Sequence, residues 1–178
     1  MNLIKIIPIL FLIVILPIAT IYDIRFRKIP NWLTFPSMVA GIAFYTYMTG
    51  SKGLIFSAEG LLLGMAFFMV FYICAGMGAG DVKLMGGIGS ILGLKGVFAA
   101  FLGTALVGGI YAIILLILHG HLKGTVKRYG EILKVFLFTG RFTYLPPEEG
   151  TELPVLSYGI AIAFGTVFSV IMKNIYRW

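Results

Sequence analysis

Long apolar runs follow one another along this 178-residue chain, and no other feature restricts its fold as strongly. A helix that crosses a bilayer needs about 20 mainly apolar residues, and within lipid only helices and closed barrels satisfy their backbone polar groups. Five runs reach or approach that length, and a sixth is shorter and rich in glycine. In chain order, the runs are 5–22, 32–49, 57–76, 82–94, 97–118 and 153–172. They predict an all-α polytopic membrane protein with six transmembrane helices.

The composition agrees with lipid as the main solvent. Hydrophobic residues make up 60% of the chain and charged residues only 12%, whereas about a quarter of a soluble domain is charged. The net charge of +7 is typical of basic residues collected in cytoplasmic loops, so we expect the lipid bilayer and no nucleic acid as a partner. Cys74, His119 and His121 form no metal-ligand pattern, so we expect no metal and no cofactor.

Basic residues also predict an orientation. With six spans, nine lysines and arginines fall on one side of the membrane and five on the other. The richer side holds the 23–31 loop, the break around Lys83 and the 119–152 loop, and we expect it to be cytoplasmic. Within the spans, two glycine pairs of the small-x-x-x-small type, Gly60/Gly64 and Gly89/Gly93, predict close packing of helices.

The 119–152 connection has a pattern of its own. Apolar residues recur at helical spacing, and charged residues occupy other positions of the wheel, which predicts an amphipathic helix on the cytoplasmic membrane surface. We expect glycines at 124, 130 and 140 to interrupt this helix and Pro146-Pro147 to end it. The apolar set is Tyr129, Ile132, Leu133, Phe136 and Leu137, and the charged set is Lys127, Arg128, Glu131 and Lys134.

The only two aspartates, Asp23 and Asp81, lie where an apolar run meets a polar break. Only two predicted spans separate them, so they face the same side of the membrane. A carboxylate at a membrane boundary costs free energy and needs a reason. Two carboxylates within hydrogen-bonding distance share a proton, and such a pair activates water and protonates a departing amine. The alternative is structural, with each aspartate capping a helix or balancing nearby basic residues.

Glycines alternate before the second aspartate, at Gly76, Gly78 and Gly80. A bare backbone there admits an extended peptide beside the carboxylate, although a simple turn between helices is the alternative. The spacing matches neither the dinucleotide-binding nor the phosphate-loop glycine motif.

These segments resemble one known family. Gly78-Ala79-Gly80-Asp81 with Lys83, and Asp23 followed by a basic stretch and Ile29-Pro30-Asn31, look like the two motifs of the type IV prepilin peptidases. The chain is most similar to the short members of Tad/Flp-type pilus systems. The resemblance implies an intramembrane aspartic endopeptidase of the inner (cytoplasmic) membrane. It would remove basic leaders at the cytoplasmic face, with Asp23 and Asp81 as its catalytic pair.

The resemblance also bears on domain organisation. Long members carry an N-terminal cytoplasmic domain with paired cysteines and also methylate the new N-terminus. We expect residues 1–178 to form a single membrane-embedded peptidase domain without that methyltransferase and zinc domain. Many members read Pro-Tyr-Gly where this chain reads Pro154-Val155-Leu156-Ser157-Tyr158-Gly159, and nothing catalytic is drawn from this stretch.

Secondary candidates flank the two motifs. Lys83 matches the family's lysine and either holds substrate backbone, tunes the aspartates or marks the cytoplasmic side. We expect Asn31 to cap the second helix after Pro30. Three glutamates before the last span form either an acidic patch for basic leaders or a solvated loop. They are Glu148, Glu149 and Glu152.

Two other functions remain open. A small transporter or channel subunit would use the aspartates to bind cations or protons along a water path reaching both faces. A different G-x-G-D protease would cut within a helix rather than at a leader junction. For the peptidase, the candidate substrates are type IV prepilins, Tad-type prepilins, secretion pseudopilins and archaeal flagellin-like precursors.

Overall fold

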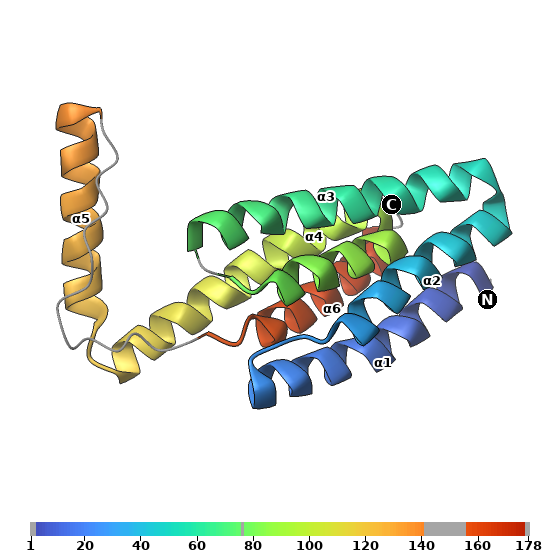
Figure 1. The fold of residues 1–178 in the computed structure, drawn as a ribbon, viewed down its shortest axis with the longest axis horizontal. Coiled ribbons are helices and arrows are strands. Elements are labelled where there is room, and N and C mark those ends of the chain that lie inside the picture. Colours follow the sequence, from blue (N-terminus) through green and yellow to red (C-terminus); the bar gives the residue numbers. More distant parts are fainter. Residues whose placement is uncertain (1–2, 76, 141–155, 177–178) are drawn as a thin grey trace. The chain divides into compact units, whose positions relative to one another are not determined.

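The computed structural model describes residues 3–75, 77–140 and 156–176, and all regular structure in these ranges is helical (Figure 1). The all-α prediction is therefore confirmed for the described residues. The helices are α1 (Leu3–Phe26), α2 (Asn31–Thr49), α3 (Ser51–Ala75), α4 (Ala79–Leu118), α5 (Leu122–Thr139) and α6 (Tyr158–Tyr176).

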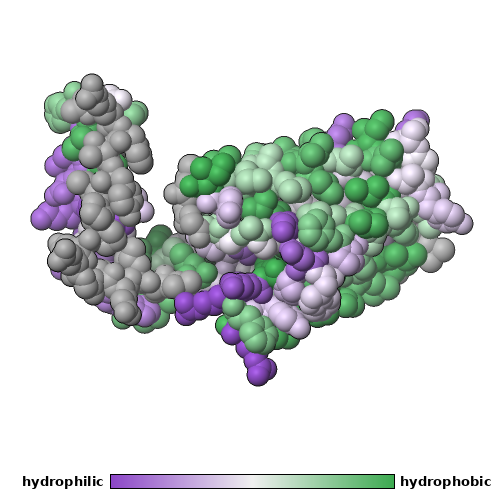
Figure 2. All heavy atoms as spheres, in the orientation of Figure 1, coloured by the Kyte–Doolittle hydropathy of each residue, from purple (hydrophilic) through white to green (hydrophobic). Residues whose placement is uncertain are grey.

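Three helices of the described residues are long and apolar enough to cross a membrane. They contribute Ile6–Phe26 of α1, Ser51–Ile73 of α3 and Ala79–Leu118 of α4, and α6 adds a shorter apolar stretch, Tyr158–Met172. Apolar residues cover most of the visible surface of these helices (Figure 2), and outward-facing side chains such as Val14, Leu62 and Leu106 are each more than half exposed. A surface of this kind matches lipid rather than water.

The chain divides into two compact units, and the division falls within α4. The first unit comprises Met1–Gly108 and Ser157–Trp178, and the second comprises Gly109–Leu156. The first unit contains both aspartates. The second contains the end of α4 and the whole of α5. The expectation of a single peptidase domain over the chain stays a prediction.

α4 consists of two helical segments joined at Gly93, whose φ of 73° and ψ of −178° are not helical. Before this break, Gly64 of α3 lies against the backbone of Met85, and Gly60 lies against the backbone of Gly89. The contact positions increase along one helix as they decrease along the other. α3 and the first segment of α4 are therefore antiparallel, and the predicted role of these glycines in close helix packing is confirmed.

After the break, α4 runs the other way past α3. Gly64 of α3 faces the Val97 side chain, and Phe67 stacks on Phe101 with ring centroids 4.5 Å apart. Here the contact positions increase along both helices, so α3 and the second segment are parallel. The chain thus reverses at Gly93, close to the boundary predicted between runs 82–94 and 97–118.

Side chains from two neighbouring helices support this reversal. A helix that ends leaves its last carbonyl groups without intrahelical partners. The Tyr45 hydroxyl of α2 donates to the Ile91 carbonyl at 2.9 Å, and the Ser57 hydroxyl of α3 donates to the Ser90 carbonyl. Both carbonyls belong to the turn that precedes Gly93. Their hydrogen bonds make the break compatible with a buried position.

The core of the first unit lies along α4. Leu84, Met85, Ile88 and Val97 of α4 and Ile162 of α6 are almost fully buried. The first α4 segment therefore passes through the interior, and Asp81, near its start, is buried.

α5 forms a continuous helix, and one expectation about it was wrong. Gly124 and Gly130 lie inside the helix instead of interrupting it, and Gly140 ends it with a left-handed φ of 64°. Glycine in a helix costs only about 1 kcal/mol, so isolated glycines weaken a strongly amphipathic segment without breaking it. Pro146-Pro147 lies outside the described residues.

Candidate active site

Asp23 lies in the last turn of α1 and is only 7% exposed. Its Oδ2 accepts a 2.7 Å hydrogen bond from the backbone N–H of Gly159, in the first turn of α6. The Thr20 hydroxyl donates to the Gly159 carbonyl at 3.4 Å, one turn before Asp23. α6 therefore fixes the orientation of this carboxylate.

The chain leaves α1 after Phe26, three residues beyond Asp23. The Arg27 N–H donates to the Asp23 carbonyl at 2.8 Å, and Arg27 has a left-handed φ of 52°. This residue closes the helix in the manner of a left-handed C-terminal cap. The following residues, Ile29 and Pro30, lead into α2.

Asp81 lies in the first turn of α4 and is 5% exposed. Its Oδ2 accepts a 3.2 Å hydrogen bond from the N–H of Gly78, while its own N–H donates to the Gly78 carbonyl at 3.0 Å. A first-turn carboxylate that reaches back in this way caps the helix. Its Oδ1 is buried and has no hydrogen-bond partner among the described residues. One oxygen of Asp81 therefore caps α4, and the other is unpaired.

The two carboxylates come from segments that pack on each other, because Gly80, one residue before Asp81, lies against Ile29, six residues after Asp23. Among the described residues, the hydrogen bonds to the two carboxylates come from the backbone N–H groups of Gly78 and Gly159, and none comes from a lysine or arginine. Charge balance by basic side chains therefore does not explain these aspartates. An unpaired buried carboxylate oxygen is costly and calls for a ligand such as water.

The two sequence motifs meet in space. A Cβ added at Gly80 would lie 2.9 Å from the Ile29 Cβ, so the α4 backbone packs directly on the segment before α2. The Lys83 ammonium donates to Asn31 Oδ1 at 2.9 Å and lies 5.1 Å from the centre of the Phe35 ring. The prediction that Asn31 caps α2 was wrong. Pro30 occupies the cap position, and the Asn31 side chain is directed to Lys83 instead.

Glycines beside each carboxylate keep the backbone bare. A Cβ at Gly78 would lie 3.1 Å from Asp81 Oδ2, and one at Gly159 would lie 2.9 Å from the Asp23 Cβ. Gly78 and Gly80 lie directly before Asp81, and their role in substrate binding stays a prediction. Gly76 lies outside the described residues. Gly159 was missed by sequence reasoning. The only signal was its place in the Tyr158-Gly159 pair of the last span.

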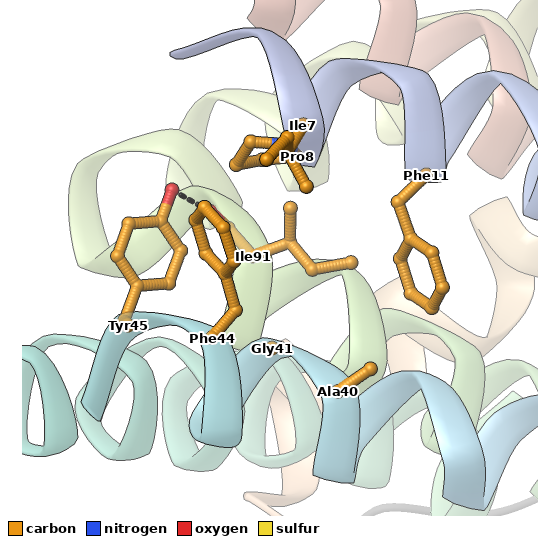
Figure 3. Close-up of a pocket in the computed structure, with 8 residues that line it drawn as sticks. All are labelled: Ile7, Pro8, Phe11, Ala40, Gly41, Phe44, Tyr45 and Ile91. Atoms are coloured by element: carbon orange, nitrogen blue, oxygen red, sulfur yellow. Dashed lines mark hydrogen bonds between the residues drawn. The ribbon is translucent and has the colours of Figure 1, made fainter. Parts of the chain in front are cut away.

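Glu148, Glu149 and Glu152 lie outside the described residues. A cavity of about 220 Å³ opens between the N-terminal half of α1, the C-terminal half of α2 and Ile91 (Figure 3). Its α1 wall ends at Phe11, 12 residues before Asp23, which is about 18 Å along a helix. Among the described residues, no group of three or more His, Cys, Asp or Glu is arranged to hold a metal ion.

The helices and the site define a class: an all-helical, membrane-type protein with a buried pair of aspartates where α1 ends and α4 begins. Comparison with known proteins gives the family. The model of the type IV leader peptidase family matches residues 10–113, which is more than half of the chain and includes both aspartates. The chain belongs to the type IV leader peptidase family.

Similar proteins occur in several bacteria, and each of those compared is named prepilin leader peptidase/N-methyltransferase. The Xanthomonas campestris pv. campestris protein is 30% identical over 119 residues, covering 64% of this chain and 42% of the relative. The Bacillus subtilis protein is 32% identical over 107 residues (58% and 42%), and the Aeromonas salmonicida protein is 28% identical over 127 residues (68% and 44%). The chain thus spans less than half the length of these curated relatives. No solved structure matches the chain.

Proposed function

We propose that the protein is a membrane-embedded aspartic endopeptidase that removes the leader from prepilin-like precursors, with Asp23 and Asp81 as its catalytic pair. The observation that carries this proposal is a pair of buried aspartates on segments that pack together, one of which has an unpaired oxygen among the described residues. Membership of the leader peptidase family supports the reaction class. The proposal concerns peptide hydrolysis and makes no claim about methyl transfer.

The chemistry follows from a pair that holds one proton. The charged carboxylate removes a proton from a water molecule as the water oxygen bonds to the carbonyl carbon of the scissile amide. The neutral carboxyl group gives its proton to the amide nitrogen as the carbon–nitrogen bond breaks. The products are a carboxylic acid and an amine. The pair again holds one proton, with the two roles exchanged.

Substrate access at this site is favoured by the bare backbone around it. Gly78 and Gly80 precede Asp81 without side chains, so an extended segment of substrate can approach the carboxylates. We further propose that Glu148, Glu149 and Glu152 attract the basic leader. Candidate substrates include type IV and Tad-type prepilins, secretion pseudopilins and archaeal flagellin-like precursors.

We propose six membrane passes, formed by α1, α2, α3, the two segments of α4 and α6. The reversal of α4 at Gly93 supports the count, because it turns one 40-residue helix into two passes. The excess of basic residues beside the aspartates supports a cytoplasmic site in the inner membrane. α5, with apolar residues on one side and lysines on the other, fits the cytoplasmic membrane surface.

The test is cleavage of a prepilin by carboxyl-to-amide variants. Asp23→Asn and Asp81→Asn should each lower the cleavage rate by more than about 10³-fold, because residues that act as a unit fail together. Glu59→Gln is the matched control, since Glu59 is an exposed carboxylate of α3, and it should cleave at the wild-type rate. The leader and mature bands on a gel report the reaction. Normal cleavage by either aspartate variant at normal expression would refute the catalytic pair.

The transporter hypothesis gives the same aspartates a different role. It needs a polar path that continues from the aspartates to the opposite face of the membrane. Directly beyond Asp81, the first segment of α4 buries Val82, Leu84 and Met85, which are apolar. Proton or sodium flux in vesicles, abolished by the Asn variants while cleavage is absent from the wild type, would favour transport.

A further inference from the structure

Lys83 and Asn31 form a direct bridge between α4, which carries Asp81, and the start of α2, which follows the helix that carries Asp23. Asn31 is the first residue of α2, eight positions after Asp23, and Lys83 lies in α4, two positions after Asp81. Their side chains meet in the 2.9 Å hydrogen bond from Nζ to Oδ1, across 52 residues of sequence.

The bridge has a second, apolar point of contact. Ile29 is buried, and its backbone carbonyl lies 3.0 Å from where a Cβ on Gly80 would be. The two contacts are side by side in sequence on both partners, at positions 29 and 31 and at positions 80 and 83. Two adjacent contacts fix both the separation and the relative rotation of two segments, whereas one contact leaves rotation free.

The Lys83 ammonium makes two contacts with α2. Besides Asn31, its ammonium lies over the Phe35 ring of α2, at 5.1 Å from the ring centre, in a cation–π arrangement. Among the described residues, the hydrogen bond to the Asp81 carboxylate comes from the Gly78 N–H and not from Lys83. The contacts of Lys83 therefore tie α4 to α2 and do not neutralise the aspartate.

We propose that Lys83 and Asn31 are a clamp that holds α2 against the start of α4 and so sets the separation of the Asp23 and Asp81 carboxylates. Lys83 is then a positioning residue and not a substrate-binding one. The expected effect on the cleavage rate rests on the proposed function. The expected effect on the distance between the segments rests on the geometry alone. A misplacement of about 1 Å between catalytic groups costs about 10²-fold in rate.

Kinetics separate positioning from substrate binding. Lys83→Met and Asn31→Leu should each lower kcat about 10- to 100-fold with KM for a leader-bearing precursor changed less than about twofold. The double variant should be no slower than the slower single variant, because both lose the same contact. Lys83→Arg and Asn31→Asp keep a donor and an acceptor and should recover most of kcat. Lys95→Met removes an exposed lysine of the same helix, beyond Gly93, and should change nothing.

A distance measurement tests the clamp without substrate. Spin labels at Arg25→Cys and Ala79→Cys, both exposed positions, in a Cys74→Ser background report the separation of α1 from the start of α4. The distance distribution should broaden or lengthen in Lys83→Met and Asn31→Leu and stay unchanged in Lys95→Met. If the protein cleaves no leader, the proposed function fails while this measurement still decides the clamp. An unchanged distribution, or a higher KM at constant kcat, would overturn the inference.

Discussion

Replacing Gly159 by alanine tests whether α6 positions Asp23. Gly159 lies in the first turn of α6, 136 residues from Asp23, and its N–H holds Asp23 Oδ2 at 2.7 Å. A Cβ at this position would lie 2.9 Å from the Asp23 Cβ and 3.0 Å from Oδ2. Unstrained carbon–carbon contacts are about 3.5–4.0 Å, so Asp23 or α6 must move by roughly 0.6–1 Å.

The size of the effect follows from this displacement. A shift of about 1 Å at a catalytic group costs about 10²-fold, so we expect kcat to fall about 10- to 100-fold. Stability should change little. Crowding costs about 1–3 kcal/mol, whereas alanine is about 1 kcal/mol better than glycine inside a helix. The net loss in the free energy of unfolding is therefore about 0–2 kcal/mol. Because the variant should stay folded, a large fall in kcat would reflect catalysis and not unfolding.

The assay is cleavage of a purified prepilin in detergent, with kcat and KM measured together with the thermal midpoint of the enzyme. Gly109→Ala is the matched control, because Gly109 is a helical glycine whose added Cβ would meet nothing within 4 Å. The control should keep wild-type kcat. If Gly159→Ala also keeps it, the contact between α6 and Asp23 has no catalytic role and the reasoning fails.

Three further predictions use other parts of the chain. Gly80→Ala should lower the cleavage rate at least tenfold at normal expression, because the new Cβ would lie 2.9 Å from the Ile29 Cβ. A measurement of kcat tests this, and an unchanged kcat would contradict it. Gly93→Ala should lower the thermal midpoint, because φ of 73° with ψ of −178° suits only glycine, at a cost of about 1–3 kcal/mol, and the added carbon would meet the Phe56 ring. An unchanged midpoint would contradict this assignment. Removing three lysines of α5 should weaken its attraction to anionic vesicles by up to about 3 kcal/mol, measured with a polarity-sensitive probe on α5 at several salt concentrations. The lysines are Lys123, Lys127 and Lys134.

Local patterns made part of the fold predictable. Apolar runs of suitable length predict helices, because in lipid the backbone N–H and C=O groups can hydrogen-bond only to each other. The glycine-rich run ends near Gly93, because glycine readily adopts the positive φ of the break at that residue. For a related reason, the sequence predicts that Asp23 and Asp81 lie at one membrane face, and this stays a prediction. Both residues end or begin an apolar run, so an even number of passes between them places them at the same membrane face.

The remaining features depend on contacts between distant segments. Asn31 after Pro30 has the local pattern of a helix cap, yet Lys83 provides a charged donor that the local pattern does not contain. Gly159 is one of 23 glycines, and only packing of α6 on α1 distinguishes it from the others. Sequence periodicity records which face of a helix is apolar. It does not record which backbone N–H group a carboxylate will meet.

The two aspartates share one arrangement, which explains why glycines adjoin both. In each, Oδ2 accepts a backbone N–H from a glycine, Gly159 for Asp23 and Gly78 for Asp81. A backbone donor is fixed by its helix and cannot rotate away, so it orients a carboxylate more firmly than a side chain does. The donor must be a glycine because a Cβ would touch the same carboxylate at about 3 Å. Orientation by backbone leaves Asp81 Oδ1 without a hydrogen-bond partner among the described residues, and in the proposed mechanism that oxygen is where a water molecule would be activated.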